Sequence, residues 1–214
     1  MIKLENVSFS YGNEKIISEL SAEFEDGRIF CIMGASGVGK TTLMNIISGR
    51  LKCTHGIIKG TDNKRSSFIF QENRLLPWYS VYENLKYVTE NEEKIIKALN
   101  DTGLYDDRNK KVADLSGGMA RRVAIARAAA FDGDVFFIDE PLYGLDVKTS
   151  QEILSLIKDT VKNKTAFIIT HSPEEAFYLA DEIIFLRNKP FSSVELVSKG
   201  IFTDADGIKS HLLA

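Results

Sequence analysis

Cysteine is scarce in this sequence. Cys31 and Cys53 are the two cysteines among 214 residues, and they form no metal-binding or redox motif. Such low cysteine use fits a reducing cytosol. Cys31 lies within the apolar run RIFCIM and is predicted to be a buried thiol.

The sequence also lacks long apolar segments and a marked charge of one sign. Its apolar runs are too short to span a bilayer, so a membrane role would come through a partner. The first residues, MIKLENVSFSYG, alternate apolar and polar side chains, which favours a strand over a signal peptide. A net charge of −3 excludes nucleic-acid binding through bulk positive charge.

The order of the predicted elements indicates an α/β fold. Short apolar or alternating segments predict strands, and apolar residues three or four apart predict helices. Strands are predicted within residues 1–30 and at 28–33, 56–60, 66–71, 134–139, 165–170 and 182–187. Helices are predicted at 41–49, 81–88, 92–104, 118–131, 147–161 and 173–180. The tail from Lys189 to Ala214 is short and mixed.

Alternating strands and helices predict a mostly parallel sheet that is covered on both faces. The all-helical middle predicts an insertion between two parts of that sheet. The expected organisation is one domain over residues 1–214. Its core is expected at about 1–71 and 132–214, and a helical subdomain at about 72–131.

The segment GASGVGKTT, residues 34–42, predicts a phosphate-binding loop. It matches the pattern G-x-x-x-x-G-K-[ST] between an apolar strand and a helix. Glycines let backbone N–H groups point at phosphate oxygens, and the helix N-terminus adds a positive dipole. Lys40 is predicted to reach the β- and γ-phosphates, and Thr41 to hold Mg²⁺. The nucleotide-binding residues predicted here are Gly34, Ala35, Ser36, Gly37, Val38, Gly39, Lys40, Thr41 and Thr42.

Two adjacent carboxylates end the run VFFIDE, residues 135–140, which has the form of a Walker B strand. A buried parallel strand would place them at its carboxyl end, where α/β sheets bind ligands. Asp139 is predicted to hold Mg²⁺ through water, and Glu140 to polarise the attacking water as general base. The alternative is a strand that ends in solvated acids, which the phosphate loop on the same chain disfavours.

Gln71 and His171 also follow predicted strands, SSFIFQ and TAFIIT. Because these strands share the sheet with the phosphate loop, His171 is predicted to contact the γ-phosphate. Gln71 is predicted to bind Mg²⁺ or water with an amide that can move. His55 and His211 have no such context and are predicted to be surface residues.

LSGGM, residues 115–119, is a second segment of the chain with glycines that favour a turn, and we call it a corner. It precedes the alanine-rich, helix-forming run MARRVAIARAAA. Ser116 and the N–H groups of Gly117 and Gly118 are predicted to begin that helix, whose N-terminus attracts anions. If the helix belongs to a separate subdomain, this corner cannot easily reach the chain's own phosphate loop.

Taken together, these motifs resemble the ATP-binding subunit of ATP-binding-cassette (ABC) transporters over residues 1–187. The matching elements are GASGVGKTT as Walker A, Gln71 as the Q-loop, LSGGM as the signature, VFFIDE as Walker B, GLD at 144–146 as the D-loop and His171 as the switch histidine. Tyr11 occupies the place of the aromatic residue that stacks on adenine. The resemblance implies an ABC-type P-loop ATPase with an antiparallel β subdomain and an inserted helical subdomain, which uses ATP and Mg²⁺.

The resemblance also implies a dimer. In this family two cassettes pack head to tail, and each ATP lies between one chain's Walker A loop and the other chain's signature. Ser116, Gly117 and Gly118 would then serve the partner's ATP. A full set of motifs on one chain favours a homodimer with twofold pairing. Pairing with a different cassette stays open.

The stretch QENRLLPWYSVYENL, residues 71–85, is similar to importers of the nitrate, sulfonate and taurine type. In that group this region receives a helix from the membrane permease, here expected near Gln71–Tyr82. The apolar anchors would be Leu75, Leu76, Trp78 and Tyr79, and packing inside the helical subdomain is an equal alternative for each. The resemblance further implies an extracytoplasmic solute-binding protein, a peripheral place on the cytoplasmic face of the inner membrane, and no nucleic-acid partner.

The chain departs from the family pattern in several places. Position 121 is arginine where many members have glutamine, and Tyr143 and Gly144 replace residues often found before Leu-Asp. The chain also stops early, which argues against a regulatory C-terminal domain. None of these departures removes a predicted catalytic group.

Three alternative functions stay open. A mechanical ABC ATPase for lipoprotein release or cell division would keep these motifs, and RLLPW argues against it. A DNA-clamp ATPase would need a long coiled coil within residues 72–115, which are too few. A degenerate cassette without turnover is disfavoured by Glu140 and His171. The transported solute depends on other subunits.

Overall fold

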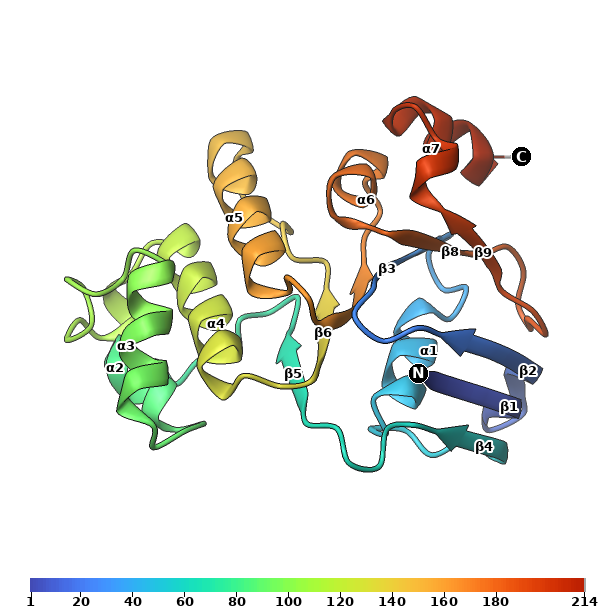
Figure 1. Ribbon diagram of the computed structural model, residues 1–214, viewed down its shortest axis with the longest axis horizontal. Helices are drawn as coiled ribbons and strands as arrows, with labels where there is room; N and C mark the ends of the chain where they lie inside the picture. Colours follow the sequence, from blue (N-terminus) through green and yellow to red (C-terminus); the bar gives the residue numbers. More distant parts are fainter. Residues whose placement is uncertain (214) are drawn as a thin grey trace.

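The computed structural model describes residues 1–213, and at its centre is a six-stranded sheet (Figure 1). The strands lie in the order β5-β6-β7-β3-β8-β9, and neighbours are parallel except β8 and β9. Their bounds are β3 Ile29–Gly34, β5 Ser66–Ile69, β6 Val135–Asp139, β7 Thr165–Ile169, β8 Glu182–Leu186 and β9 Glu195–Ser198. The predicted α/β class and the mostly parallel sheet are confirmed.

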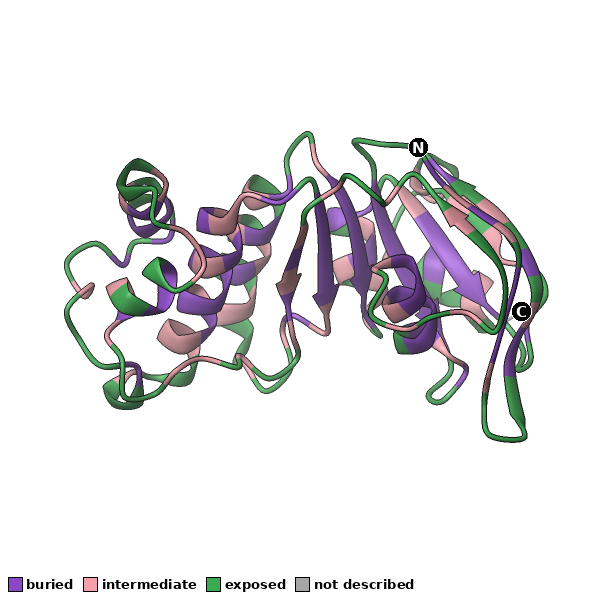
Figure 2. Ribbon diagram, turned by 90° about the horizontal axis from the view of Figure 1, so that it is seen from below, coloured by how far each residue is buried: buried purple, intermediate pink, exposed green. Residues whose placement is uncertain are grey.

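Helices cover both faces of this sheet, which explains why its central strands β3 and β7 are buried along their whole length (Figure 2). The covering helices include α1 Lys40–Ile47, α5 Val147–Thr160 and α6 Pro173–Leu179. Side chains alternate between the faces, so Phe30 packs on the side of α1 while Cys31 faces α5 and α6. Cys31 is fully buried, as predicted, and burial raises the pKa of its thiol.

A second sheet has three antiparallel strands in the order β2-β1-β4. Their bounds are β1 Ile2–Tyr11, β2 Glu14–Phe24 and β4 His55–Lys59. The turn between β1 and β2 uses Gly12 at a φ of 55°, which glycine adopts without a Cβ clash. Leu4 and Phe24 pack in the same cluster as α1, so this sheet covers the α1 side of the core. The predicted antiparallel subdomain is confirmed.

Three helices lie between β5 and β6 in the chain, and we call them the helical group. They are α2 Val81–Lys86, α3 Glu92–Asp101 and α4 Gly117–Phe131. The group lies at one end of the molecule, on the left in Figure 1, and Leu85, Leu99 and Val123 belong to an apolar cluster of its own. A separate core allows such a group to move as a unit against the sheet.

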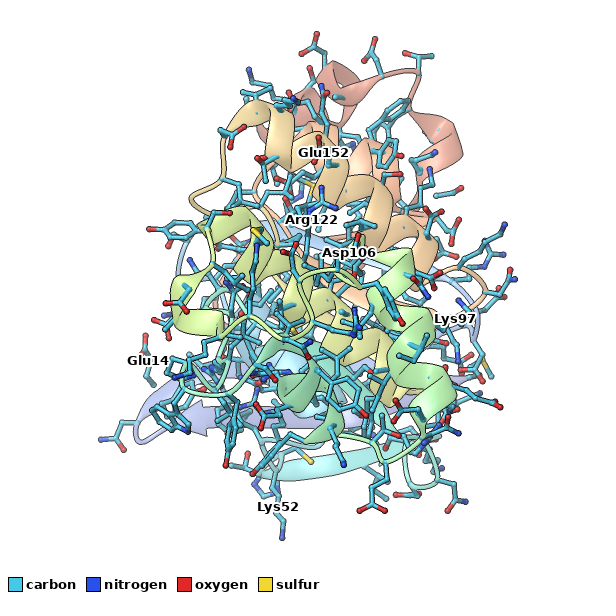
Figure 3. All side chains as sticks on the ribbon, turned by 90° about the vertical axis from the view of Figure 1, so that its left-hand side faces the viewer. Glu14, Lys52, Lys97, Asp106, Arg122 and Glu152 are labelled. Carbon is cyan, nitrogen blue, oxygen red and sulfur yellow. The ribbon has the colours of Figure 1, made fainter. Side chains whose placement is uncertain are left out.

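Polar side chains set where the helices of this group begin. Ser80 and Glu83 form a reciprocal capping box at α2, and Asn91 and Ser116 cap α3 and α4. On the outer side, Arg122 of α4 forms an ion pair with Glu152 of α5 at 2.5 Å (Figure 3). The helical group is therefore joined to the sheet layer by side-chain contacts as well as by the chain.

The tail is more ordered than its mixed sequence indicates. β9 pairs antiparallel with β8, and a short 3-10 helix, Lys199–Ile201, leads to α7, Ala205–Leu213. The prediction of His211 as a surface residue is wrong. Its half-buried ring packs 4.7 Å from Phe185 and 5.5 Å from Phe202, and Nε2 lies 2.7 Å from Glu195. Sequence periodicity missed this because each segment is short and depends on β8 for its contacts.

Among residues 1–213, no helix has both the length and the apolar character that crossing a bilayer requires.

Candidate functional site

The strand ends bring together three of the predicted catalytic residues. β5, β6 and β7 are adjacent and parallel, so the residues that follow them meet at one edge of the sheet. The Gln71 amide Nε2 donates to one carboxylate oxygen of Glu140 at 3.2 Å, and Nε2 of His171 lies 3.1 Å from the other. Glu140 is thus held from two sides.

The backbone at Glu140 is unusual. Its φ is 41°, a left-handed conformation that a non-glycine residue adopts only when its surroundings stabilise it. The Glu140 N–H donates to the carbonyl of Ile169 at 3.0 Å, which ties the end of β6 to β7. This turn directs the chain out of the strand immediately after Asp139.

The phosphate loop follows β3 and leads into α1. The ammonium of Lys40 is buried and donates to the carbonyls of Gly34 and Ala35, both at 3.0 Å. Burial lowers the pKa of Lys40, and the nearby Glu140 and Asp139 partly offset this. Gly39 has a φ of 113°, and a Cβ there would lie 2.7 Å from Ile16, so the loop needs glycine at this point.

The outer part of the loop is open. Ala35, Ser36, Gly37 and Thr41 are exposed, while Val38 and Thr42 are buried. Of the nine predicted residues, Gly34 therefore ends β3, residues 35–39 form the loop with its exposed tip, and residues 40–42 begin α1.

The side chains predicted to hold Mg²⁺ present only oxygen donors. They are the exposed hydroxyl of Thr41, the half-buried carboxylate of Asp139 and the amide of Gln71. Burial raises the pKa of Asp139, the neighbouring Glu140 raises it further, and Lys40 opposes both. Mg²⁺ prefers hard oxygen ligands and is held by few side chains together with phosphates and water, so this set fits the ion.

Two residues beside this cluster were not identified from the sequence. Thr170 is buried and donates its hydroxyl to the Glu175 carboxylate at 2.6 Å. Burial raises the pKa of Glu175, and its bond with Thr170 partly opposes this. A cavity of about 310 Å³ is lined by Glu140, Leu142, Tyr143, Thr170, His171, Ser172 and Glu175. The sequence feature that could have identified this pair is a Thr directly after a strand, followed five residues later by a Glu in the first turn of the next helix.

The signature residues lie apart from this cluster. Ser116 caps α4 by accepting from the Met119 N–H at 3.3 Å, and α4 begins at Gly117, one residue before the predicted start. The first turn of α4 contains no acidic residue, so its N–H groups remain attractive to an anion. α4 contacts β5, whereas the phosphate loop follows β3. β5 and β3 are three strands apart, a distance of about 14 Å at about 4.8 Å per strand.

Tyr11 ends β1 and is 51% exposed, and its ring meets Phe9 edge-on with centroids 4.8 Å apart. About half of the Tyr11 surface is thus exposed to solvent, which is compatible with the predicted stacking on adenine. The structure therefore leaves that assignment as a prediction.

The exposure of the apolar residues after Gln71 bears on whether each is an anchor for a partner or part of the core. Trp78 is 69% exposed and Tyr79 is 41% exposed, so neither is core. Leu75 is partly buried and packs against the apolar cluster of the helical group, as the core-packing alternative expects, and its role as an anchor stays a prediction. Trp78 and Tyr79 form an exposed aromatic pair ahead of α2.

Comparison with known proteins gives consistent results. The sequence profile of the family described as ABC transporter matches residues 17–143. The taurine import ATP-binding protein TauB of Jannaschia sp. is 34% identical over 210 residues, covering 88% of this chain and 78% of that protein. The bicarbonate transport ATP-binding protein CmpD of Synechococcus elongatus is 33% identical over 213 residues, covering 89% and 77%. A solved dimeric ATP-binding cassette bound to ADP and Pi is 28% identical, with a TM-score of 0.76 over 93% of this chain and 99% of that one.

Proposed function

Because this chain belongs to the family of ABC transporter ATP-binding proteins, we propose that it hydrolyses ATP at the point where Gln71, Glu140 and His171 converge, and that this powers solute import. The observation that supports the site most directly is the Glu140 carboxylate, held between an imidazole and an amide at the end of β6. The relatives act in import of taurine and transport of bicarbonate, which supports a small polar solute as the cargo.

Binding of the triphosphate rests on the loop from Gly34 to Thr42. The Lys40 ammonium, which contacts two loop carbonyls in this structure, would turn to the β- and γ-phosphate oxygens. Tyr11 would stack on the adenine. Thr41 and Asp139, with Gln71 close by, would hold Mg²⁺, and the ion would supply positive charge to offset the negative charge that develops during hydrolysis.

Hydrolysis would follow from the position of Glu140. Its carboxylate accepts the proton of a water whose oxygen attacks the γ-phosphorus, while the bond to the β-phosphate oxygen breaks to give ADP and phosphate. His171 would contact the γ-phosphate and Gln71 would orient the water. These roles explain why both side chains approach Glu140 in this structure.

The signature would act on a second copy of the chain. The N-terminus of α4 lies away from the chain's own phosphate loop and is free of acidic side chains. In a twofold dimer, Ser116, Gly117 and Gly118 would complete the partner's ATP site. ATP would favour this dimer only by binding it more tightly than the separated chains.

The hydrolytic role is tested with Glu140→Gln. Turnover should fall below detection while Mg·ATP binding persists, and the variant should accumulate as an ATP-bound dimer in size-exclusion chromatography with light scattering. Glu25→Gln, on an exposed turn, is the matched control and should keep normal turnover. A fully active Glu140→Gln variant would remove Glu140 from the reaction.

The import role is tested by copurification. The chain is expressed with its neighbouring genes, extracted in mild detergent and pulled down. We expect a permease that contacts the region near Gln71–Tyr82 on the cytoplasmic face, together with a solute-binding protein whose ligand identifies the cargo. A division or lipoprotein-release partner would keep the ATPase and overturn import.

A further inference from the structure

Arg121 occupies an unusual place for an arginine. It is 3% exposed, and burial lowers the pKa of its guanidinium to about 10. It lies in α4, a few residues after the Ser116 cap. All of its hydrogen-bond partners are neutral oxygens, and this argues against a simple ion pair. A buried arginine has five N–H donors in a rigid plane, so it fixes the atoms around it.

The partners of Arg121 lie on two separate segments of the site. On one side, Nε donates to the carbonyl of Pro141 at 2.7 Å and Nη2 to the carbonyl of Glu140 at 3.4 Å. On the other side, Nη1 donates to the carbonyl of Phe70 at 2.5 Å and to that of Gln71 at 3.4 Å. One guanidinium therefore holds the backbones of both Glu140 and Gln71.

This contact coincides with the strained backbone of the site. Glu140 has a φ of 41°, and Arg121 donates to the carbonyls of the two consecutive residues Glu140 and Pro141. Without those bonds, two carbonyls at a strained turn would lose their donors, and the carboxylate of Glu140 would lose its fixed direction.

The two other arginines of α4 do not reach this turn. Arg122 points outward to Glu152 on α5 (Figure 3). Arg127 donates to the carbonyls of Asn73 at 3.1 Å and Arg74 at 2.8 Å, so it holds only the segment after Gln71. Arg127 is therefore a matched control: a partly buried guanidinium on the same helix that bonds the same segment without the Glu140 turn.

We propose that Arg121 is a positioning residue for hydrolysis, which aligns the Glu140 carboxylate and the Gln71 amide by holding their backbones from the signature helix. This inference rests on the proposed role of Glu140. It goes beyond that role because it connects α4, which begins at the signature, to the catalytic carboxylate of the same chain. Movement of α4 would then be transmitted to Glu140 through a single side chain.

The test compares Arg121→Met, Arg121→Gln and Arg127→Met in steady-state ATP hydrolysis, with rates normalised to the folded fraction from nucleotide binding. Arg121→Met should lower kcat by about 10- to 100-fold while KM for ATP changes by less than about threefold, because misaligned groups lose rate more than binding. Arg121→Gln keeps donors for one segment and should recover part of kcat. Arg127→Met should stay within about threefold of wild-type kcat.

A second measurement separates positioning from folding and from the role of Glu140 itself. The double variant Arg121→Met with Glu140→Gln should still form the ATP-bound dimer, because the proposed role concerns hydrolysis and not ATP or partner binding. Loss of that dimer, equal loss of kcat in Arg121→Met and Arg127→Met, or wild-type kcat in Arg121→Met would each overturn the proposal. If Glu140→Gln alone remains active, the proposed function fails first, independently of Arg121.

Discussion

The chain contains two glycine-containing segments that could bind a phosphate: the Walker A corner, residues 34–42, and the signature corner, residues 115–119. They differ in how the rest of the protein supports them. The Walker A loop grows out of the central sheet, has its base buried and holds its own Lys40 at 3.0 Å from two loop carbonyls. The signature corner stands at the start of α4, on a helical group with its own apolar cluster, and Ser116 and Gly117 are exposed. The first corner has a base packed into the core, whereas the second lies at a solvent-exposed helix start.

This difference explains why one domain needs both corners. The loop after β3 can bind a triphosphate with residues of its own chain, since the lysine, the glycines and the helix start are continuous. The start of α4 offers N–H groups and a hydroxyl but has no neighbouring cation in its first turn and lies beside β5. In the proposed twofold dimer, a second copy of the chain would supply the phosphate for this corner.

We expect the largest effect from a substitution that disables the Walker A corner alone. Lys40→Met should lower Mg·ATP affinity of the monomer by at least about 100-fold and abolish hydrolysis, because Lys40 is the cationic side chain of the segment GASGVGKTT. Isothermal titration calorimetry with ATP measures the first effect. Lys52→Met is the control, since Lys52 is exposed on the loop after α1 and points away from the protein (Figure 3). Unchanged affinity in Lys40→Met would show that the loop is not the binding site.

We expect the next largest effect from a substitution that disables the signature corner and leaves the Walker A corner intact. Ser116→Arg should lower hydrolysis by at least about 100-fold, because the bulky cation blocks the approach of the partner's ATP. ATP binding to the monomer should stay within about threefold. Asn91→Arg also removes a helix cap in the helical group, so it controls for the loss of about 1 kcal/mol of cap stability. If monomer binding falls in Ser116→Arg, the signature acts within its own chain.

The structure of the Walker A corner could largely be predicted from the sequence, whereas the surroundings of the signature helix α4 could be predicted only in part. A strand, a glycine loop and a helix in succession determine the Walker A geometry locally, so the loop and the strand ends were predictable. The meeting of Gln71, Glu140 and His171 was predictable because parallel strands align their carboxyl ends. The burial of Arg121 was not, because most of its acceptors are backbone carbonyls 19 to 51 residues away in sequence.

The tail shows the same limit. β9 and α7 are short, and their stability comes from β8 and from packing such as that of His211 on Phe185. Local periodicity cannot reveal an element whose apolar contacts are all tertiary. Leu75 shows a related limit, since the sequence alone does not distinguish an apolar residue that anchors a partner from one that packs in the core.

A smaller effect tests whether the helical group transmits a signal between a docking face and the signature corner. Trp78→Ala should leave the turnover of the isolated subunit within about twofold, because its side chain is 69% exposed. In the reconstituted transporter the same change should lower solute uptake by about 10-fold or more, because an exposed aromatic anchor is lost. Tyr87→Ala, also strongly exposed in the helical group, is the control. A collapse of isolated turnover would mean that Trp78 supports folding.

The smallest effect compares one glycine from each corner. Gly37 has a φ of 76°, so Gly37→Ala should lower the free energy of unfolding by about 1–2 kcal/mol in urea denaturation. Gly117 is helical, and a Cβ there would meet nothing within 4 Å, so Gly117→Ala should leave stability unchanged or raise it slightly. Gly117→Ala should nevertheless reduce dimer-dependent hydrolysis, since its Cβ enters the space proposed for the partner's phosphate. Equal destabilisation by the two substitutions would show that both corners are constrained from within one chain.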